Sequence, residues 1–191
     1  METLNDCKDR GLIGQFGGSN WTFERIMQAN AYAGSHGLQP FTMVSPNYCM
    51  ADYVNDPWGG SVSLSGPEAA AYRKWLEETQ TPVFNYSSLG RGYLSGKFRT
   101  DADVPIEKCL WEGPIMEYDC AKNRQRLSRA EQLAAAKGAT VAQICLKWLL
   151  MQPMNLFPIV SPSSAEHMKE VAGAFEVPLS AEEAACLTAA V

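Results

Sequence analysis

The chain has 191 residues, of which 46% are hydrophobic and 19% are charged, a composition typical of one folded globular domain rather than a disordered segment. Its formal net charge is -5, and its Lys and Arg residues form no basic cluster. This charge pattern disfavours a role in binding nucleic acid.

Four short apolar runs, each bounded by Gly, Pro, Ser or Asn, are typical of buried strands. Each is followed, directly or after a loop, by residues with helical periodicity. Strands that alternate with helices predict a parallel sheet, so we expect an α/β fold in a single domain over residues 1–191. The runs are LIGQFG (12–17), FTMVS (41–45), PVFNYSS (82–88) and LFPIVS (156–161).

The helical patterns follow the strands in chain order, and three of them begin with a capping box, a Ser followed three residues later by Glu. The boxes pair Ser65 with Glu68, Ser163 with Glu166, and Ser180 with Glu183. An insert containing Gly and Pro, residues 90–114, lies before the third unit's helices, and such long loops are often functional. One hypothesis is that it covers a sugar-like ligand. The expected helices span 22–36, 65–79, 118–137, 141–152, 163–175 and a short segment from 180.

Cysteines and histidines form no metal-binding or disulfide pattern. No C-x-x-C pair occurs, and the two histidines, His36 and His167, are far apart. We therefore expect reduced thiols and no metal site. The six cysteines are Cys7, Cys49, Cys109, Cys120, Cys145 and Cys186.

Neither a signal peptide nor a membrane span is expected. The amino terminus, METLNDCKDRG, is polar, and the most apolar window, VAQICLKWLLMQ, is short and contains Lys147. The sequence predicts a cytoplasmic protein that does not bind membranes.

Four segments occur in the order found in the carboxy-terminal half of the aldo-keto reductases, and the chain resembles that family over essentially its whole length. These enzymes are (β/α)8 barrels that bind a nicotinamide dinucleotide, usually NADPH. The resemblance implies that the four apolar runs are barrel strands five to eight, so that the chain would be half of a TIM barrel with an added C-terminal helix. The segments are GGSNWTFERI, NYSSLGRGYLSGKF, VAQICLKWLLMQP and PIVSPSSAEHMKEVAGA.

The resemblance also implies a site for the cofactor at the ends of the strands. Ser19 and Asn20 would hydrogen-bond the nicotinamide carboxamide, which needs both donors and acceptors. Tyr86 would stack on the nicotinamide ring, and Ser87 and Leu89 would contact the pyrophosphate. A plainer interpretation stays open, in which GGSNW is only a strand-to-helix turn with a capping residue and the Tyr is barrel packing.

Phosphate groups in such barrels favour the loops after strands seven and eight, which here read SSLGRG and SPSSAE. Ser161 lies in the second loop, and Ser163 or Ser164 would cap a helix whose free N–H groups favour anions. Arg91 and Lys97 are interpreted as solvated charges. Trp58, Trp75, Trp111 and Trp148 are interpreted as packing residues rather than stacking platforms.

The chain departs from the family pattern at both ends of this site. Ser45 stands where many relatives have a Gln that reaches the nicotinamide amide. His167 stands where the family commonly has an Arg for the 2'-phosphate, and Glu170 and Val171 replace a Glu-Asn pair at the adenine. Discrimination between NADP and NAD should be weak, and the site could have been lost.

The resemblance also places the family's catalytic Asp, Tyr, Lys and His on the first four strand units, outside this chain, so no catalytic residue is assigned. We expect an NAD(P)-binding oxidoreductase part that is inactive without an N-terminal half, because acid-base assistance contributes on the order of 10² to 10⁴ in rate. The alternative is a non-catalytic assembly or regulatory module. Open strand edges should be closed by an N-terminal half-barrel, a fused domain or self-association.

Overall fold

The protein is described from a computed structural model that covers residues 1–56 and 58–189. Strands and helices alternate in the amino-terminal part, whereas the carboxy-terminal part is helical. The helices are α1 (Glu2–Asp9), α2 (Phe23–Ser35), α3 (Ala70–Thr79), α4 (Glu112–Tyr118), α5 (Ala121–Lys137), α6 (Val141–Leu150), α7 (Ala165–Ala172) and α8 (Ala181–Thr188). The strands are β1 (Gly17–Ser19) and β2 (Met43–Ser45), and the 3-10 turns are η1 (Pro67–Ala69), η2 (Gly90–Gly92), η3 (Ile106–Lys108) and η4 (Gly173–Glu176).

Strands β1 and β2 are parallel, with Gly18 opposite Val44, as the alternating pattern predicts. Both are shorter than the predicted runs: β1 begins at Gly17, the last residue of the run 12–17, and β2 takes up the last three residues of the run 41–45. A reason for the close pairing is visible at Gly17, where an added Cβ would lie 2.1 Å from the carbonyl oxygen of Met43. Only glycine allows the two backbones to approach this closely.

The third and fourth apolar runs extend the same parallel arrangement through single bridges. Val83 bridges to Val44 on one side and to Leu156 on the other, both in parallel orientation. The N–H of Phe84 donates to the carbonyl of Val44 at 2.9 Å, and the N–H of Phe157 donates to the carbonyl of Val83 at 2.8 Å. Four extended segments therefore lie side by side in sequence order.

Helix starts follow local chemistry closely where a Ser or Thr side chain reaches the first turn. Helix α2 begins after Thr22, whose hydroxyl accepts from the backbone N–H of Arg25 at 3.3 Å. The predicted capping box of Ser180 and Glu183 is confirmed at the start of α8. Both caps satisfy backbone donors that would otherwise have no partner.

Two predicted helix starts are wrong by one or more residues. Ser65 caps nothing, because its hydroxyl donates to the carbonyl of Cys49 at 3.2 Å, and η1 and α3 begin after Gly66 instead. The cap of α7 is Ser164, which accepts from the N–H of His167 at 3.1 Å, and not Ser163. In both cases a neighbouring tertiary contact or an adjacent hydroxyl decides which residue becomes the cap.

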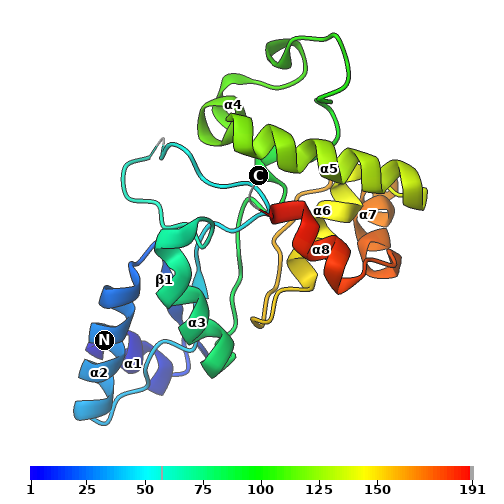
Figure 1. Ribbon diagram of the computed structural model, residues 1–191. Coiled ribbons are helices and arrows are strands. Elements are labelled where there is room, and N and C mark those ends of the chain that lie inside the picture. Colours follow the sequence, from blue (N-terminus) through cyan, green and yellow to red (C-terminus); the bar gives the residue numbers. More distant parts are fainter. Residues whose placement is uncertain (57, 190–191) are drawn as a thin grey trace.

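Figure 1 shows the helices in two groups, with α1, α2 and α3 beside the first strands and α5 to α8 gathered around the carboxy-terminal part. Helix α6 is the centre of the second group, since it contacts α5, α7 and η4. Its side chains are almost all buried, which matches its apolar sequence. The core is continuous between the two groups, and Val83, Leu94 and Leu149 are each completely buried in it.

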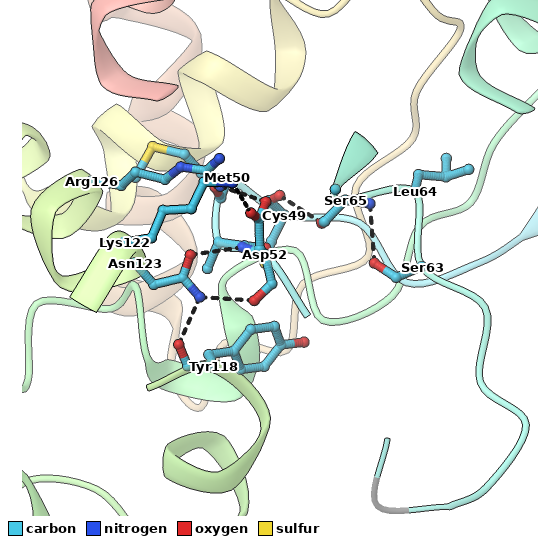
Figure 2. Close-up of polar contacts among 12 residues, drawn as sticks. Cys49, Met50, Asp52, Ser63, Leu64, Ser65, Tyr118, Lys122, Asn123 and Arg126 are labelled. Carbon is cyan, nitrogen blue, oxygen red and sulfur yellow. Dashed lines mark hydrogen bonds and ion pairs between the residues drawn. The ribbon is translucent and has the colours of Figure 1, made fainter. Parts of the chain in front are cut away.

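A polar cluster ties the segment after β2 to helix α5 (Figure 2). Asp52 accepts from Arg126 at 2.7 Å and forms an ion pair with Lys122, while the side-chain amide of Asn123 bonds both the N–H and the carbonyl of Asp52 at 2.8 Å. Burial raises the pKa of Asp52, but the hydrogen bonds from Lys122 and Arg126 outweigh it and hold the pKa below its usual value. The long loop after β2 is thus anchored at its start.

Within the described residues, no single helix has the length and apolarity to cross a membrane, and only α5 and α6 together pass that test, bent by 104°. The six cysteines are described as free thiols.

Candidate dinucleotide site

The predicted site residues lie where the extended segments end and loops begin. Asn20, directly after β1, and Ser87, directly after the third segment, both have left-handed backbones, with φ of 56° and 53°. This conformation is uncommon for residues other than glycine, and Asn tolerates it better than most. Each segment therefore turns sharply at its carboxyl end, where barrel proteins hold ligands.

Two of the hydroxyls expected at the nicotinamide already have partners within the strand layer. Ser19 donates from Oγ to the carbonyl of Ser45 at 3.0 Å, and Ser45 donates from Oγ to the carbonyl of Phe84 at 2.7 Å. As hydrogen-bond donors both are engaged, although their lone pairs can still accept. The structure thus brings the two serines together and uses them to link neighbouring segments.

Asn20 and Tyr86 are brought together as well. The Tyr86 hydroxyl donates to Oδ1 of Asn20 at 2.8 Å, and the N–H of Val62 donates to the same oxygen at 3.1 Å. Burial raises the pKa of Tyr86, so its hydroxyl is protonated and acts as a donor. The Asn20 amide nitrogen has no acceptor among the described hydrogen bonds.

The third and fourth segments end at a cavity of about 730 Å³, a volume within the range of sites for drug-sized ligands and cofactors. Four of the predicted residues, Ser87, Leu89, Ser161 and His167, line it together, and Ser163 does not. The remaining lining residues are Ser88, Arg91, Gly92, Ser95, Lys97, Ala142, Ile159, Val160, Pro162, Glu170 and Val171.

The turn after the third segment lines this cavity. Ser88 is buried, and its hydroxyl donates to the carbonyl of Ile159 at 2.9 Å, which joins the two walls of the cavity. Among the backbone hydrogen bonds of the described loops, none uses the N–H of Ser88 or of Leu89. Adjacent unpaired N–H groups in a sharp turn favour a phosphate oxygen.

Arg91 is held at the cavity wall by three side chains that sequence reasoning missed. It forms an ion pair with Glu117, a carboxylate with no exposed surface, and its guanidinium lies 4.8 Å and 4.4 Å from the ring centroids of Trp58 and Trp111. The interpretation of Arg91 as a solvated charge is therefore wrong. Both indoles are 58% exposed and stack on this cation, so they are not simple core packing.

Lys97 is the other cation of the cavity lining, and no ion pair of residues 1–56 or 58–189 includes it. Nδ1 of His167 accepts a hydrogen bond from the backbone N–H of Ser163 at 3.3 Å. His167 therefore lines the cavity with its Nδ1 already engaged by a backbone donor. Glu170 lines the same wall.

The GRG sequence after a strand end was the signal that could have drawn attention to Arg91, whose φ of 54° lies in the left-handed region that residues other than glycine seldom adopt. Nothing in the sequence pointed to Glu117, which lies 26 residues away.

Comparison with known proteins shows the family to which the chain belongs. The model of the Aldo/keto reductase family matches residues 1–191. Aldo-keto reductase yakc [NADP(+)] from Schizosaccharomyces pombe is 28% identical over 181 residues, which are 94% of this chain and 48% of that protein. Norsolorinic acid reductase B from Dothistroma septosporum is 26% identical, with 96% of this chain and 42% of the relative covered.

The fold is also similar to that of a solved structure, the thermostable aldo-keto reductase Tm1743 in complex with the inhibitor epalrestat. The TM-score is 0.64 at 22% identity, over 98% of this chain and 52% of that one. The chain therefore spans about half the length of the proteins it matches. Since the family model covers every residue, the chain belongs to the aldo/keto reductase family of oxidoreductases.

Proposed function

We propose that this chain is the nicotinamide-dinucleotide-binding, carboxy-terminal half of an aldo-keto reductase barrel, acting in carbonyl reduction or alcohol oxidation. The observation that supports this most strongly is the cavity of about 730 Å³, where two predicted phosphate-binding loops meet with unpaired backbone donors and the Lys97 ammonium. Anionic diphosphates are the ligands that such a donor set favours.

The residues of the site would match both parts of a dinucleotide, the adenine with its phosphates and the nicotinamide. The N–H groups of Ser88 and Leu89 and the Lys97 ammonium would hold phosphate oxygens, and the apolar side chain of Val171 would lie against the adenine. The free amide nitrogen of Asn20 would donate to the nicotinamide carboxamide, and the ring of Tyr86 would stack on the nicotinamide. When bound, the cofactor would supply the hydride.

Completion of the reaction requires a proton donor from outside the matched strand units. We assign the four extended segments to half of a (β/α)8 barrel, because they are parallel, lie in sequence order and match about half of each relative. By resemblance, the catalytic acid belongs to the other half. Without it, we expect turnover to be lower by on the order of 10² to 10⁴.

We further propose that NADPH and NADH bind with similar affinity. The imidazole of His167 cannot supply the bidentate charged contact that an Arg gives a 2'-phosphate. The name of the fission yeast relative specifies NADP(+), so similar affinity of this chain for NADPH and NADH would be a difference from that protein. The predicted cytoplasmic location stays a prediction.

Titration of NADPH and NADH, followed by nicotinamide fluorescence, tests the proposal. Lys97→Ala should weaken the binding of both cofactors by about ten- to a hundredfold, because a charge-assisted hydrogen bond contributes about 1.5–3 kcal/mol. Lys108→Ala, which removes an exposed lysine outside the cavity lining, is the matched control and should change nothing. Equal affinities in Lys97→Ala and the parent chain would contradict the site.

A second candidate function is a non-catalytic assembly or regulatory module. It is favoured by the engagement of Ser19 and Ser45 as donors within the strand layer, which leaves fewer groups for a nicotinamide. Failure of the parent chain to bind either cofactor at millimolar concentration would support this alternative.

A further inference from the structure

A buried polar network adjoins the cavity at the point where the third segment ends. The side-chain amide of Asn85 donates from Nδ2 to the carbonyl of Tyr48 at 2.9 Å and to the hydroxyl of Ser88 at 3.1 Å. The Ser88 hydroxyl in turn lies within donating distance of two carbonyls, that of Asn85 at 3.2 Å and that of Ile159 at 2.9 Å. The network therefore joins the segment after β2 to the third and fourth segments, and Ser88 is its member in the cavity lining.

Asn85 is a costly residue at this buried position. Its side chain has no exposed surface, and its Oδ1 has no hydrogen-bond partner among the described residues. A buried acceptor without a partner lowers stability, and an apolar side chain of similar shape would avoid that cost. Stability alone therefore explains this residue poorly, and what it adds to the fold is the pair of hydrogen bonds that it donates to Tyr48 and Ser88.

The network flanks a turn whose backbone is strained. Ser87 has a φ of 53°, in the left-handed region that a serine seldom adopts. The N–H of Gly90 closes the turn by donating to the carbonyl of Ser87 at 2.7 Å. Such a conformation persists only where neighbouring contacts hold it. The hydrogen bonds between Asn85 and Ser88 span Ser87 and are contacts of this kind.

We propose that Asn85 is a positioning residue for the phosphate end of the dinucleotide site. By bonding Ser88, it holds the turn 87–89 in the shape in which the N–H groups of Ser88 and Leu89 have no backbone partner among the described residues. Asn85 is not one of the residues described as lining the cavity, so it acts on a ligand only through this turn. The inference rests on the proposed function, which assigns those two N–H groups to the phosphates.

Calorimetry with ADP-ribose tests the inference. Asn85→Leu keeps a similar side-chain shape and removes both donors, and it should raise the dissociation constant about tenfold. A strained turn that loses its support is populated for a smaller fraction of the time, and the affinity falls by that fraction.

Asn123→Leu is the matched control. Asn123 is as completely buried as Asn85, it bonds the backbone of Asp52 and the carbonyl of Tyr118, and it lies outside the described cavity lining. Its replacement should lower the stability of the chain and leave the affinity of the folded protein for ADP-ribose unchanged. Circular dichroism establishes the temperature range in which each variant is folded.

A change at Ser87 separates positioning from a general loss of structure. Glycine adopts a positive φ without a side-chain penalty, so a turn with Ser87→Gly needs less support from Asn85. Asn85→Leu should therefore weaken ADP-ribose binding about tenfold in the parent chain but about threefold or less in the Ser87→Gly chain. An equal factor in both chains, or unchanged affinity in Asn85→Leu, would overturn the inference and leave the proposed function intact.

Nuclear magnetic resonance of the ligand-free chain gives a readout that needs no cofactor. Asn85→Leu should move the backbone chemical shifts of Ser87 away from those of a left-handed residue. Ser88→Ala, which removes only the hydroxyl of the network, should do the same and replaces Asn85→Leu if that variant does not fold. Unmoved shifts in a folded variant would overturn the inference. Shifts that move in a chain whose parent binds neither ADP-ribose nor NADH would support the positioning of the turn and overturn the proposed function instead.

Discussion

The two ends of the proposed dinucleotide site are built differently. At the phosphate end, two loops enclose a large cavity with unpaired backbone N–H groups, and Lys97 lines it without an ion pair among the described residues. At the nicotinamide end, Ser19 and Ser45 already donate to neighbouring carbonyls, and the hollow beside them is about 150 Å³. The phosphate end has hydrogen-bond donors available for a ligand, whereas the serine hydroxyls of the nicotinamide end already donate to backbone carbonyls.

This difference follows from where each end lies in the fold. The phosphate end is enclosed by the turn after the third segment, the fourth segment and the start of α7, all of which belong to this chain. The nicotinamide end lies on the face of the strand layer that carries Ser19, Ser45 and Phe84. We therefore expect the phosphate end to contribute most of the cofactor affinity of this chain alone.

The largest expected effect on stability comes from replacing Arg91, which lines the cavity at the phosphate end. Arg91→Met should destabilise the protein by about 3–5 kcal/mol, because it leaves the buried carboxylate of Glu117 without its partner. Urea unfolding measures this change. The double variant Arg91→Met with Glu117→Leu should recover most of the stability, because it removes both charges together. A single variant as stable as the parent would show that the ion pair is not formed.

Asp52 anchors the loop after β2 to helix α5. Replacing it should have a smaller effect on stability, and one that depends on pH. Because the folded pKa of Asp52 is below its ordinary value, its contribution is complete above about pH 4 and is lost as the pH falls through the folded pKa. Asp52→Asn should cost about 2 kcal/mol at pH 7, since charge-assisted bonds to Lys122 and Arg126 are lost.

Unfolding curves from pH 7 to pH 2 test this sign. The difference between the parent and Asp52→Asn should shrink as the pH falls below about 4. A difference that is constant with pH, or that grows in acid, would contradict the assigned role of the carboxylate.

The smallest effect is expected at the nicotinamide end. Tyr86→Phe removes the hydrogen bond to Asn20 but keeps the ring, so it should change stability by about 1 kcal/mol or less and cofactor affinity by about twofold or less. Isothermal titration calorimetry of the chain alone measures the affinity. A loss of affinity as large as that from Lys97→Ala would show that the two ends of the site contribute equally to cofactor binding, which would contradict the difference between them.

Sequence reasoning predicted the order of strands and helices because apolar runs and helical periodicity are local. The caps at Thr22 and Ser180 were readable for the same reason, since each contact spans three residues. The cap at Ser65 was not, because the Cys49 carbonyl 16 residues away takes its hydroxyl. Contacts between distant segments decide which hydroxyl caps a helix, and these contacts cannot be recognised in a single sequence.

The same distinction applies to the site. Ser87, Leu89, Ser161 and His167 were found through the resemblance of their segments, and the structure brings them into one cavity. The contacts of Arg91 with Glu117 and two indoles were missed, because their members come from the turn η2, helix α4 with its N-cap, and the loop after β2.

Calorimetry with the two halves of the cofactor tests the central claim most directly. ADP-ribose contains the adenosine and both phosphates, and nicotinamide mononucleotide contains the nicotinamide and one phosphate. The account predicts that ADP-ribose binds the chain within about threefold of the affinity of NADH, a difference of under about 1 kcal/mol, while nicotinamide mononucleotide shows no measurable binding. Tight binding of nicotinamide mononucleotide with no binding of ADP-ribose would contradict it.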